Sequence, residues 1–266
     1  MKQLVMTLLG IMLINAMTQG QNQDSLARSH KAKMDLLMTR PSKPVKTIGI
    51  YLYDGFQTLD AMGPYETLAE MGGGIKVFFV AQKKGWIKNQ RGLKIAVDTS
   101  IAEVNQLDIL VIPGGAMETF LQTQDSSVLN WIRRIDEHSI YTTSVCTGAW
   151  ILGATGLLRD KKATTNWYRA DEMLARYGAT FQNRRWVQDG KYWTSAGVTA
   201  GLDMSLAIIK DLMGEQFAQG IMLNLEYDPH PPVQGGSPNK TPLLVTEMMR
   251  EMYDLGILPL LNKTKK

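Results

Sequence analysis

The single cysteine of the chain lies where a nucleophile could act. Residues 141–145 are mostly β-branched or aromatic and predict a short strand that runs into Cys146, and residues 147–158 predict a helix. Cys146 would then occupy a strand-to-helix turn, with Gly148 allowing the backbone to pack closely. We expect the first N–H groups of the helix to lower the pKa of the thiol. The alternative is an inert buried cysteine, which is the more common use of an isolated thiol.

Three carboxyl groups follow the first predicted strand, residues 47–53, and one of them is a candidate partner for the thiol. Asp54 precedes Gly55 and is interpreted as a turn residue, while Asp60 stands where a helix begins. A carboxyl group buried beside a thiol would have a raised pKa and could hold a proton to donate. Helix capping is the alternative role of Asp60, and Glu66 is the third carboxyl group.

Other chemistry is less well supported by the residues present. The three histidines, His30, His138 and His230, form no ligand cluster, and no second cysteine exists, so no metal site is expected. A distant histidine could still serve a cysteine hydrolase. Trp167 is interpreted as part of the core or of a pocket wall.

The elements that would position Cys146 alternate between strands and helices. Residues 47–53, 75–81 and 107–113 are apolar runs of strand length, and the last is followed by Gly114 and Gly115, whose N–H groups could hold an anion. A helix is expected over residues 59–71, closed by three glycines, and another after a cap at Asp125 or Ser126. Residues 181–187 and 192–195 predict a hairpin with a type I′ turn at Asp189-Gly190. The alternation predicts one α/β domain with a mostly parallel sheet, whose site lies at the carboxyl ends of the strands.

The composition is that of a globular protein, with 44% hydrophobic and 20% charged residues among 266. The net charge of +4 comes from scattered residues, so nucleic-acid binding is not expected.

The N-terminus suggests export. Residues 1–20 combine Lys2, an apolar run and small residues, which predicts a signal peptide and a periplasmic or secreted protein with no membrane span after cleavage; an uncleaved N-terminal membrane anchor is the alternative. We expect residues 21–46 to form a linker, with one short helix at about residues 26–38. Residues 47–242 would form the domain, and residues 243–266 a C-terminal helix and tail.

Seven segments occur in an order that resembles a known family: residues 57–64 (QTLDAMGP), 112–115 (IPGG), 143–148 (TSVCTG), 152–158 (LGATGLL), 163–167 (ATTNW), 199–203 (TAGLD) and 225–227 (LEY). The chain resembles the isocyanide hydratases of the ThiJ/PfpI superfamily, which is related to class I glutamine amidotransferases. The resemblance extends from about residue 47 to residue 242.

The resemblance implies a flavodoxin-like three-layer sandwich, a homodimer, a small-molecule substrate, and no metal or organic cofactor. It places the catalytic nucleophile at Cys146, the catalytic acid at Asp60, and a third catalytic position at Thr147, whose N–H and hydroxyl would line the site. Four further residues are expected to contact substrate: Gly114, Gly115, Gly148 and Trp167. The implied reaction is hydration of an isocyanide to an N-substituted formamide.

Two residues depart from the patterns of relatives. Thr147 stands where the amidotransferase and peptidase branches often have His, which argues against those activities. Asn166 stands where many relatives have His, so the polarity of the pocket is expected to differ.

Two alternatives to a hydratase stay open. One is a ligand-binding or oxidation-sensing protein, and the other is a thiol enzyme of the glyoxalase or deglycase type. A transcription factor is not expected, because only 39 residues, 228–266, follow Tyr227, too few for paired helix-turn-helix units.

Overall fold

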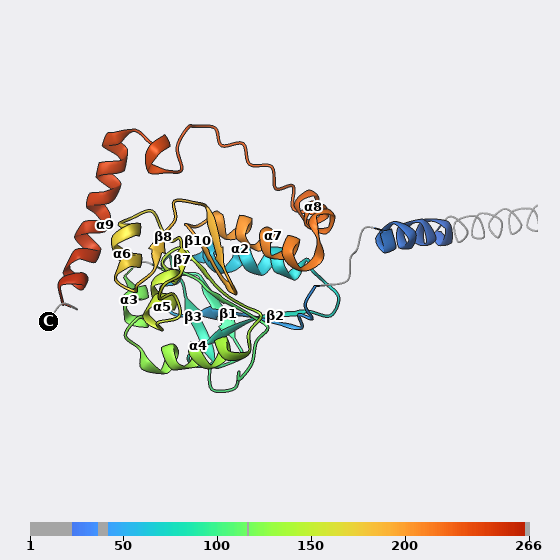
Figure 1. Cartoon of the computed structure of the whole chain (residues 1–266), viewed down its shortest axis with the longest axis horizontal. Coiled ribbons are helices and arrows are strands. Elements are labelled where there is room, and N and C mark those ends of the chain that lie inside the picture. The colour runs from blue at the N-terminus through green and yellow to red at the C-terminus, as the bar shows by residue number, and fades with distance from the viewer. Residues whose placement is uncertain (1–22, 37–41, 116, 264–266) are drawn as a thin grey trace, which may run out of the picture.

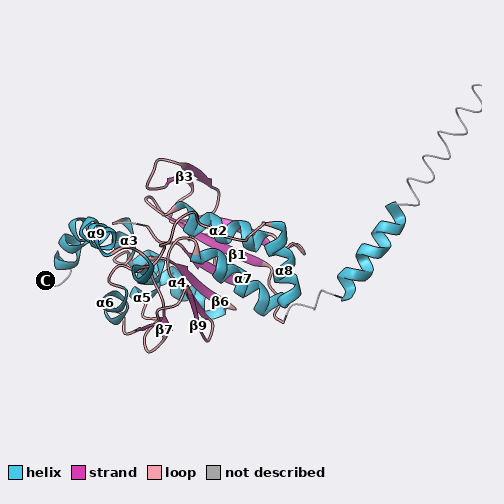
Figure 2. Ribbon diagram, turned by 90° about the horizontal axis from the view of Figure 1, so that it is seen from above, coloured by secondary structure: helices cyan, strands magenta, loops and turns pink. Residues whose placement is uncertain are grey.

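The computed structural model describes residues 23–36, 42–115 and 117–263. The proposed signal peptide and the last three residues of the tail therefore lie outside the described residues. Residues 23–36 form a helix that is exposed at every position and lies apart from the sheet (Figures 1 and 2). Within the described ranges, no helix has both the length and the apolar character that crossing a membrane requires.

A six-stranded sheet forms the centre of the domain, in the order β2-β1-β5-β6-β10-β9. The strands are β1 (Thr47–Leu52), β2 (Lys76–Ala81), β5 (Ile109–Ile112), β6 (Tyr141–Val145), β9 (Trp186–Asp189) and β10 (Tyr192–Ser195). Every pairing is parallel except that of β9 with β10. The five parallel strands follow the flavodoxin-like order 2-1-3-4-5, which reverses direction beside β1. The predicted fold class is confirmed.

Helices cover both faces of this sheet and complete the three layers (Figure 1). The helices α2 (Thr58–Ala69) and α7 (Ala200–Met213) pack together on one face. The helices α4 (Ser126–His138) and α5 (Gly148–Ala154) lie on the other. Three further helices are α3 (Glu118–Gln122), α6 (Ala170–Ala175) and α8 (Glu215–Asn224).

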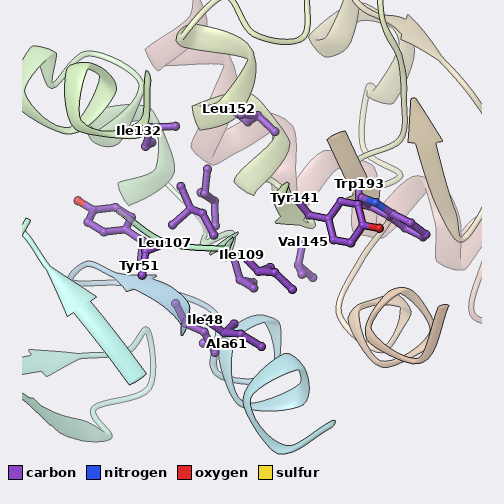
Figure 3. Close-up of a cluster of buried hydrophobic side chains, with 14 of the residues drawn as sticks. Ile48, Tyr51, Ala61, Leu107, Ile109, Ile132, Tyr141, Val145, Leu152 and Trp193 are labelled. Atoms are coloured by element: carbon purple, nitrogen blue, oxygen red, sulfur yellow. The ribbon is translucent and has the colours of Figure 1, made fainter. Parts of the chain in front are cut away.

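The core lies between the strands and the two helical layers. All four residues of β5 are buried, as the apolar run predicts for a strand covered on both faces. Figure 3 shows Ile132 of α4 and Leu152 of α5 on one side of the strands and Ala61 of α2 on the other.

Local signals read from the sequence explain how several helices begin and end. The Asp125 side chain accepts hydrogen bonds from the N–H groups of Ser127 and Val128, so it is the cap of α4. Helix α2 ends at Ala69, and the three glycines that follow have positive φ angles of 59°, 62° and 83°. Glycine adopts this backbone conformation without a steric penalty.

The predicted hairpin exists, but its register and turn differ from the expectation. Strand β9 begins at Trp186, because residues Thr180–Phe181 instead form β8 and pair with β7 (Lys162–Ala163). Asp189 pairs with Tyr192, so the turn is Gly190-Lys191, and only Gly190 has a positive φ. This pattern is that of a type II′ turn rather than type I′.

The structure adds a hairpin that the sequence did not predict and gives the bounds of the predicted C-terminal helix. Strands β3 (Gly85–Lys88) and β4 (Lys94–Val97) form a small separate hairpin. After α8 the chain runs as a long connection containing one short 3-10 helix, η1 (Pro238–Lys240), and then forms α9 (Leu243–Lys263), the expected last helix. Figure 1 shows α9 against the part of the domain that carries α3 and α6.

Candidate active site

The candidate residues converge at the carboxyl ends of the parallel strands. Cys146 follows β6 directly, Gly114 follows β5 after one proline, and Asp60 lies in the first turn of α2, after β1. Gly197 follows β10, and its backbone comes so close that a Cβ there would lie 3.7 Å from the Cys146 Sγ. This edge of the sheet, near the point where the strand order reverses, is where open α/β sheets bind ligands.

Cys146 occupies the strained turn expected of a nucleophile. Its φ is +60°, a conformation that non-glycine residues rarely adopt, and only 6% of its surface is exposed. Its N–H donates to the Ser195 carbonyl at 3.0 Å, and its carbonyl accepts from the Thr165 hydroxyl at 2.8 Å. These two bonds tie the turn to the neighbouring strand end and to the loop after β7.

Gly148 makes this turn possible by packing rather than by facing the thiol. A Cβ at this position would lie 2.1 Å from the Ile112 carbonyl oxygen, so any side chain would push α5 away from β5. The structure therefore gives Gly148 a backbone role at the turn.

Asp60 is a fully buried carboxyl group with only partial hydrogen bonding. Its Oδ2 accepts from the Gly114 N–H at 3.1 Å, and its Oδ1 has no hydrogen-bond partner among the described residues. Burial raises the pKa of Asp60 to about 7, although the Gly114 N–H and the Cys146 thiol each lower it in part. A carboxyl group with this pKa can both accept and donate a proton near neutral pH.

The predicted lowering of the thiol pKa is wrong for this structure. Burial, and then the charge of Asp60, raise the pKa of Cys146 well above its ordinary value. The Thr147 N–H at the start of α5 and the Asn166 amide do lower it, but the helix has only seven residues and the desolvation is larger. The resting thiol is therefore protonated.

The two groups are best treated as one acid–base pair. Burial raises the pKa of both groups, and the charge of Asp60 raises that of Cys146 further, so the pair carries at most one negative charge near neutral pH. Transfer of the thiol proton to the carboxylate would give a thiolate beside a carboxylic acid. The pair then holds the nucleophile and the proton that the expected reaction needs.

The hydroxyl of Thr147 belongs to a buried network rather than facing outward. It donates to the Gly115 carbonyl at 2.7 Å, accepts from the Gly115 N–H at 3.0 Å, and lies 3.0 Å from the Thr119 hydroxyl. The Tyr53 hydroxyl lies 3.1 Å from Thr119 and donates to the Pro113 carbonyl. The network thus joins the ends of β1, β5 and β6.

The same bonds change the expectation for the two glycines after β5. The N–H of Gly114 is bonded to Asp60 and that of Gly115 to Thr147, so neither is free to bind an anion. A Cβ at Gly114 would lie 2.6 Å from the Thr147 Oγ1 and 2.9 Å from the Asp60 Oδ2. Glycine at 114 therefore lets the carboxyl group and the turn approach each other.

The loop after β7 supplies a donor to the thiol. The Asn166 Nδ2 donates to the Cys146 Sγ at 3.5 Å, and its Oδ1 accepts from the Tyr168 N–H at 3.0 Å. Trp167 next to it is partly buried and lines a cavity of about 190 Å³ together with Pro238 and Met249 of the C-terminal segment. Trp167 is thus next to Asn166 in the sequence, but the cavity that it lines does not include Cys146 or Asp60 among its lining residues.

Sequence reasoning missed several residues that surround the pair. Tyr53 and Thr119 belong to the buried network, and Tyr253 of α9 stacks on Tyr168, two residues after Asn166, with ring centroids 5.0 Å apart. Tyr53 follows a recognisable strand, so its position could have suggested a role. Tyr253 is more than one hundred positions from Cys146, and no local pattern links them.

The histidines do not join this site. His30 lies in the exposed helix of residues 23–36, His138 ends α4, and His230 is exposed beside Asp228. Among the described ranges, no group of three or more His, Cys, Asp or Glu residues is arranged to hold a metal ion.

Comparison with known proteins finds relatives over most of the chain. The model of the DJ-1/PfpI family matches residues 46–211. The chain is 38% identical to "Isonitrile hydratase" of Pseudomonas putida over 204 residues, which cover 77% of this chain and 88% of that protein.

Solved structures show the same fold. A ThiJ/PfpI family protein from Pseudomonas syringae superposes with a TM-score of 0.75 at 33% identity, covering 79% of this chain and 86% of that one. Drosophila melanogaster DJ-1beta superposes with a TM-score of 0.61 at 22% identity, over 69% of this chain and 98% of its own.

Proposed function

Since the chain belongs to the DJ-1/PfpI family, we propose that it is a cysteine-dependent hydratase that converts an isocyanide, also called an isonitrile, to an N-substituted formamide. One observation carries the proposal: the fully buried Asp60 carboxyl group, whose Oδ1 has no hydrogen-bond partner among the described residues, lies at the same strand ends as the buried Cys146 thiol. Burial raises the pKa of this carboxyl group to about 7. The isonitrile hydratase relative supports the choice of substrate class.

The first step would add the thiol across the isocyanide carbon. Asp60 takes the proton from Cys146, the sulfur attacks the terminal carbon of R–N≡C, and Asp60 returns the proton to that carbon. The product is a thioimidate, Cys146–S–CH=N–R, and Asp60 is again a carboxylate. Because Asp60 Oδ1 has no hydrogen-bond partner among the described groups, it can exchange this proton without breaking a bond.

The second step would release the product by addition of water. Asp60 removes a proton from water as the water oxygen attacks the thioimidate carbon, and then passes this proton to the nitrogen. As the carbonyl forms and the carbon–sulfur bond breaks, Asp60 takes the remaining hydroxyl proton and returns it to the sulfur, and R–NH–CHO is released. A single carboxyl group that alternates between acid and base works best with a pKa near the working pH, as Asp60 has.

Asn166 and the Thr147 N–H would stabilise the thiolate. Both lower the pKa of Cys146 against the larger effect of burial, so they act in the direction that ionisation needs. Neither group carries a charge, which avoids a permanent ion pair with the sulfur.

The test is to incubate the purified protein with an alkyl or aryl isocyanide and to measure the formamide by chromatography. Wild-type turnover that is lost in Cys146→Ala and in Asp60→Asn would support the proposal. Asp136→Asn is a matched control, because Asp136 is also buried but pairs with Lys191 at the opposite end of the sheet.

Failure of wild-type turnover, with a thiol that still reacts with iodoacetamide, would reject isocyanide as the substrate. Assays with α-oxoaldehydes would then test glyoxalase-like chemistry. A thiol that reacts neither with iodoacetamide nor with α-oxoaldehydes would favour a ligand-binding protein. The signal peptide, the periplasmic or secreted location and the homodimer stay predictions, which N-terminal sequencing, fractionation and light scattering would test.

A further inference from the structure

The loop of residues 113–115 follows β5 and carries the N–H group that bonds to Asp60. The Gly114 N–H donates to the Asp60 Oδ2 at 3.1 Å, and the Gly114 carbonyl accepts from the Gln57 N–H at 2.7 Å. A Cβ at Gly114 would lie 2.9 Å from the Asp60 Oδ2, so the loop backbone and the carboxyl group are in close contact. The direction of this N–H therefore depends on how the loop is held on either side of Gly114.

Two hydroxyl groups hold the loop, one on each side of Gly114. The Tyr53 hydroxyl donates to the Pro113 carbonyl at 3.2 Å. This carbonyl and the Gly114 N–H belong to one planar peptide group, so a bond to the oxygen also fixes the direction of the N–H. On the other side, the Thr147 hydroxyl donates to the Gly115 carbonyl at 2.7 Å and accepts from the Gly115 N–H at 3.0 Å.

Thr119 of α3 joins these two hydroxyl groups. Its Oγ1 lies 3.1 Å from the Tyr53 hydroxyl and 3.0 Å from the Thr147 hydroxyl. A hydroxyl group has one hydrogen to donate, and that of Thr147 goes to the Gly115 carbonyl, so Thr119 donates to Thr147. Thr119 can then act only as an acceptor for Tyr53, whose hydrogen is shared with the Pro113 carbonyl.

The core fixes the place of α3 and hence of Thr119. Phe120, the next residue, is buried in a cluster with Trp150 and Ile257, and its ring centroid lies 5.3 Å from that of Trp150. Thr119 itself is fully buried. Its hydroxyl is therefore a fixed point between the ends of β1 and β6.

We infer that Thr119 is a positioning residue: through the two hydroxyl groups that it joins, it holds the Gly114 N–H against Asp60. Loss of the Thr119 hydroxyl should loosen this N–H without removing any group that takes part in the reaction. The inference rests on the acid–base pair of the proposed function but not on isocyanide as the substrate.

The Gly114 N–H favours the carboxylate form of Asp60. Its hydrogen bond lowers the pKa of Asp60 against the larger effect of burial, so a looser bond would raise this pKa. Cys146, Tyr53 and Tyr253 also interact with the charge of Asp60. Burial raises the pKa of each of these three groups, so each is protonated in the resting protein.

Three variants separate the hydroxyl of Thr119 from its packing. Thr119→Val replaces the hydroxyl by a methyl group, whereas Thr119→Ser keeps the hydroxyl and removes the methyl group. Thr143→Val is the matched control, because Thr143 of β6 is also fully buried but its hydroxyl has no hydrogen-bond partner among the described residues. The rate of Cys146 alkylation by iodoacetamide would be measured against pH, and kcat and KM for an isocyanide would be measured in parallel.

The midpoint of the alkylation profile reports the first ionisation of the acid–base pair. We expect it to shift upward by about 0.5–1 pH unit in Thr119→Val, the effect of losing one ordinary hydrogen bond. Thr119→Ser and Thr143→Val should both keep the wild-type midpoint. With an isocyanide, Thr119→Val should lower kcat near neutral pH and leave KM unchanged, because no group that binds substrate is removed.

A wild-type midpoint in Thr119→Val would overturn the inference. A shift in Thr119→Ser as large as that in Thr119→Val would also overturn it, because the packing of the methyl group would then be the cause. An equal shift in Thr143→Val would show that the effect is not specific to the bonded hydroxyl.

Two substitutes keep the test decisive. Thr119→Ala, with the same expected shift, replaces a valine variant that does not fold. If iodoacetamide does not modify the thiol, the pH dependence of urea unfolding of the same variants gives the shift in the pKa of Asp60. A wild type that hydrates no isocyanide would reject the substrate class, while the pH profiles would still decide the role of Thr119.

Discussion

Replacing Asp60 by asparagine should change how the stability of the protein depends on pH. The pKa of this carboxyl group is raised from an ordinary 3.8 to about 7, with burial as the main cause. The folded state therefore binds the proton more tightly than the unfolded state. The free energy of unfolding that Asp60 contributes is greatest at low pH and falls as the pH rises from the unfolded toward the folded pKa.

The size of the effect follows from the shift. Each pH unit in which the unfolded carboxyl group is ionised and the folded one is not lowers the stability by about 1.4 kcal/mol. Between about pH 5 and about pH 8 this amounts to about 3 kcal/mol, because the folded group ionises near the top of that interval. Asp60→Asn has no such ionisation, so its stability relative to the wild type should rise by about 3 kcal/mol across the interval.

Urea unfolding followed by tryptophan fluorescence would measure this difference, since Trp131, Trp150 and Trp193 are buried. Subtracting the wild-type curve from that of the variant cancels the other titrating groups. Asp125→Asn is the control: hydrogen bonds from Ser127 and others lower the pKa of Asp125, so it is ionised in both states and its difference should stay constant.

A difference between wild type and Asp60→Asn that stays constant over this range would refute the reasoning. It would mean that Asp60 is ionised in the folded protein as it is in the unfolded chain. The carboxyl group would then hold no proton to donate near neutral pH, and the proposed acid–base pair would lose its basis.

Three further outcomes are expected. Gly114→Ala should lower the free energy of unfolding by about 1–3 kcal/mol and reduce turnover, because its Cβ would lie 2.6 Å from the Thr147 Oγ1; denaturation and the formamide assay would show this. Asp125→Ala should remove the cap of α4, lowering stability by about 1 kcal/mol while leaving turnover unchanged. Asn166→Ala should raise the pKa of the Cys146 thiol and slow its alkylation by iodoacetamide by about fivefold near neutral pH, with equal rates contradicting the role of the amide.

Local sequence patterns predicted structure correctly where a run of apolar residues forms a buried strand or where a side chain caps a helix. The apolar run of β5 and the Asp125 cap were read correctly, because each depends on interactions within a few residues. The hairpin was misplaced because Thr180 and Phe181 pair with β7, a partner that no local pattern reveals. The β3–β4 hairpin was missed because its residues are largely exposed and show no clear alternation.

The candidate site also has features that local sequence predicts and features that depend on tertiary contacts. The turn at Cys146 follows from a strand and a helix that meet in the sequence, so its position was predictable. The direction of the thiol pKa was not, because the helix N-terminus is a local feature whereas the desolvation comes from several strand ends that close around the sulfur. Likewise, the glycines after β5 looked like free donors until their partners, Asp60 and Thr147, were in place.

The amino-acid sequence by itself determined the alternation of the central parallel strands with helices, the place of the nucleophile between β6 and α5, and the side chains available for chemistry. Only the tertiary structure decided that Asp60 and Cys146 are both buried at the same strand ends, and that Tyr253 of α9 packs on the loop that carries Asn166. The physical reason is that propensity and capping act over a few residues. Desolvation and side-chain contacts depend on all the atoms that surround a group, whatever their distance along the chain.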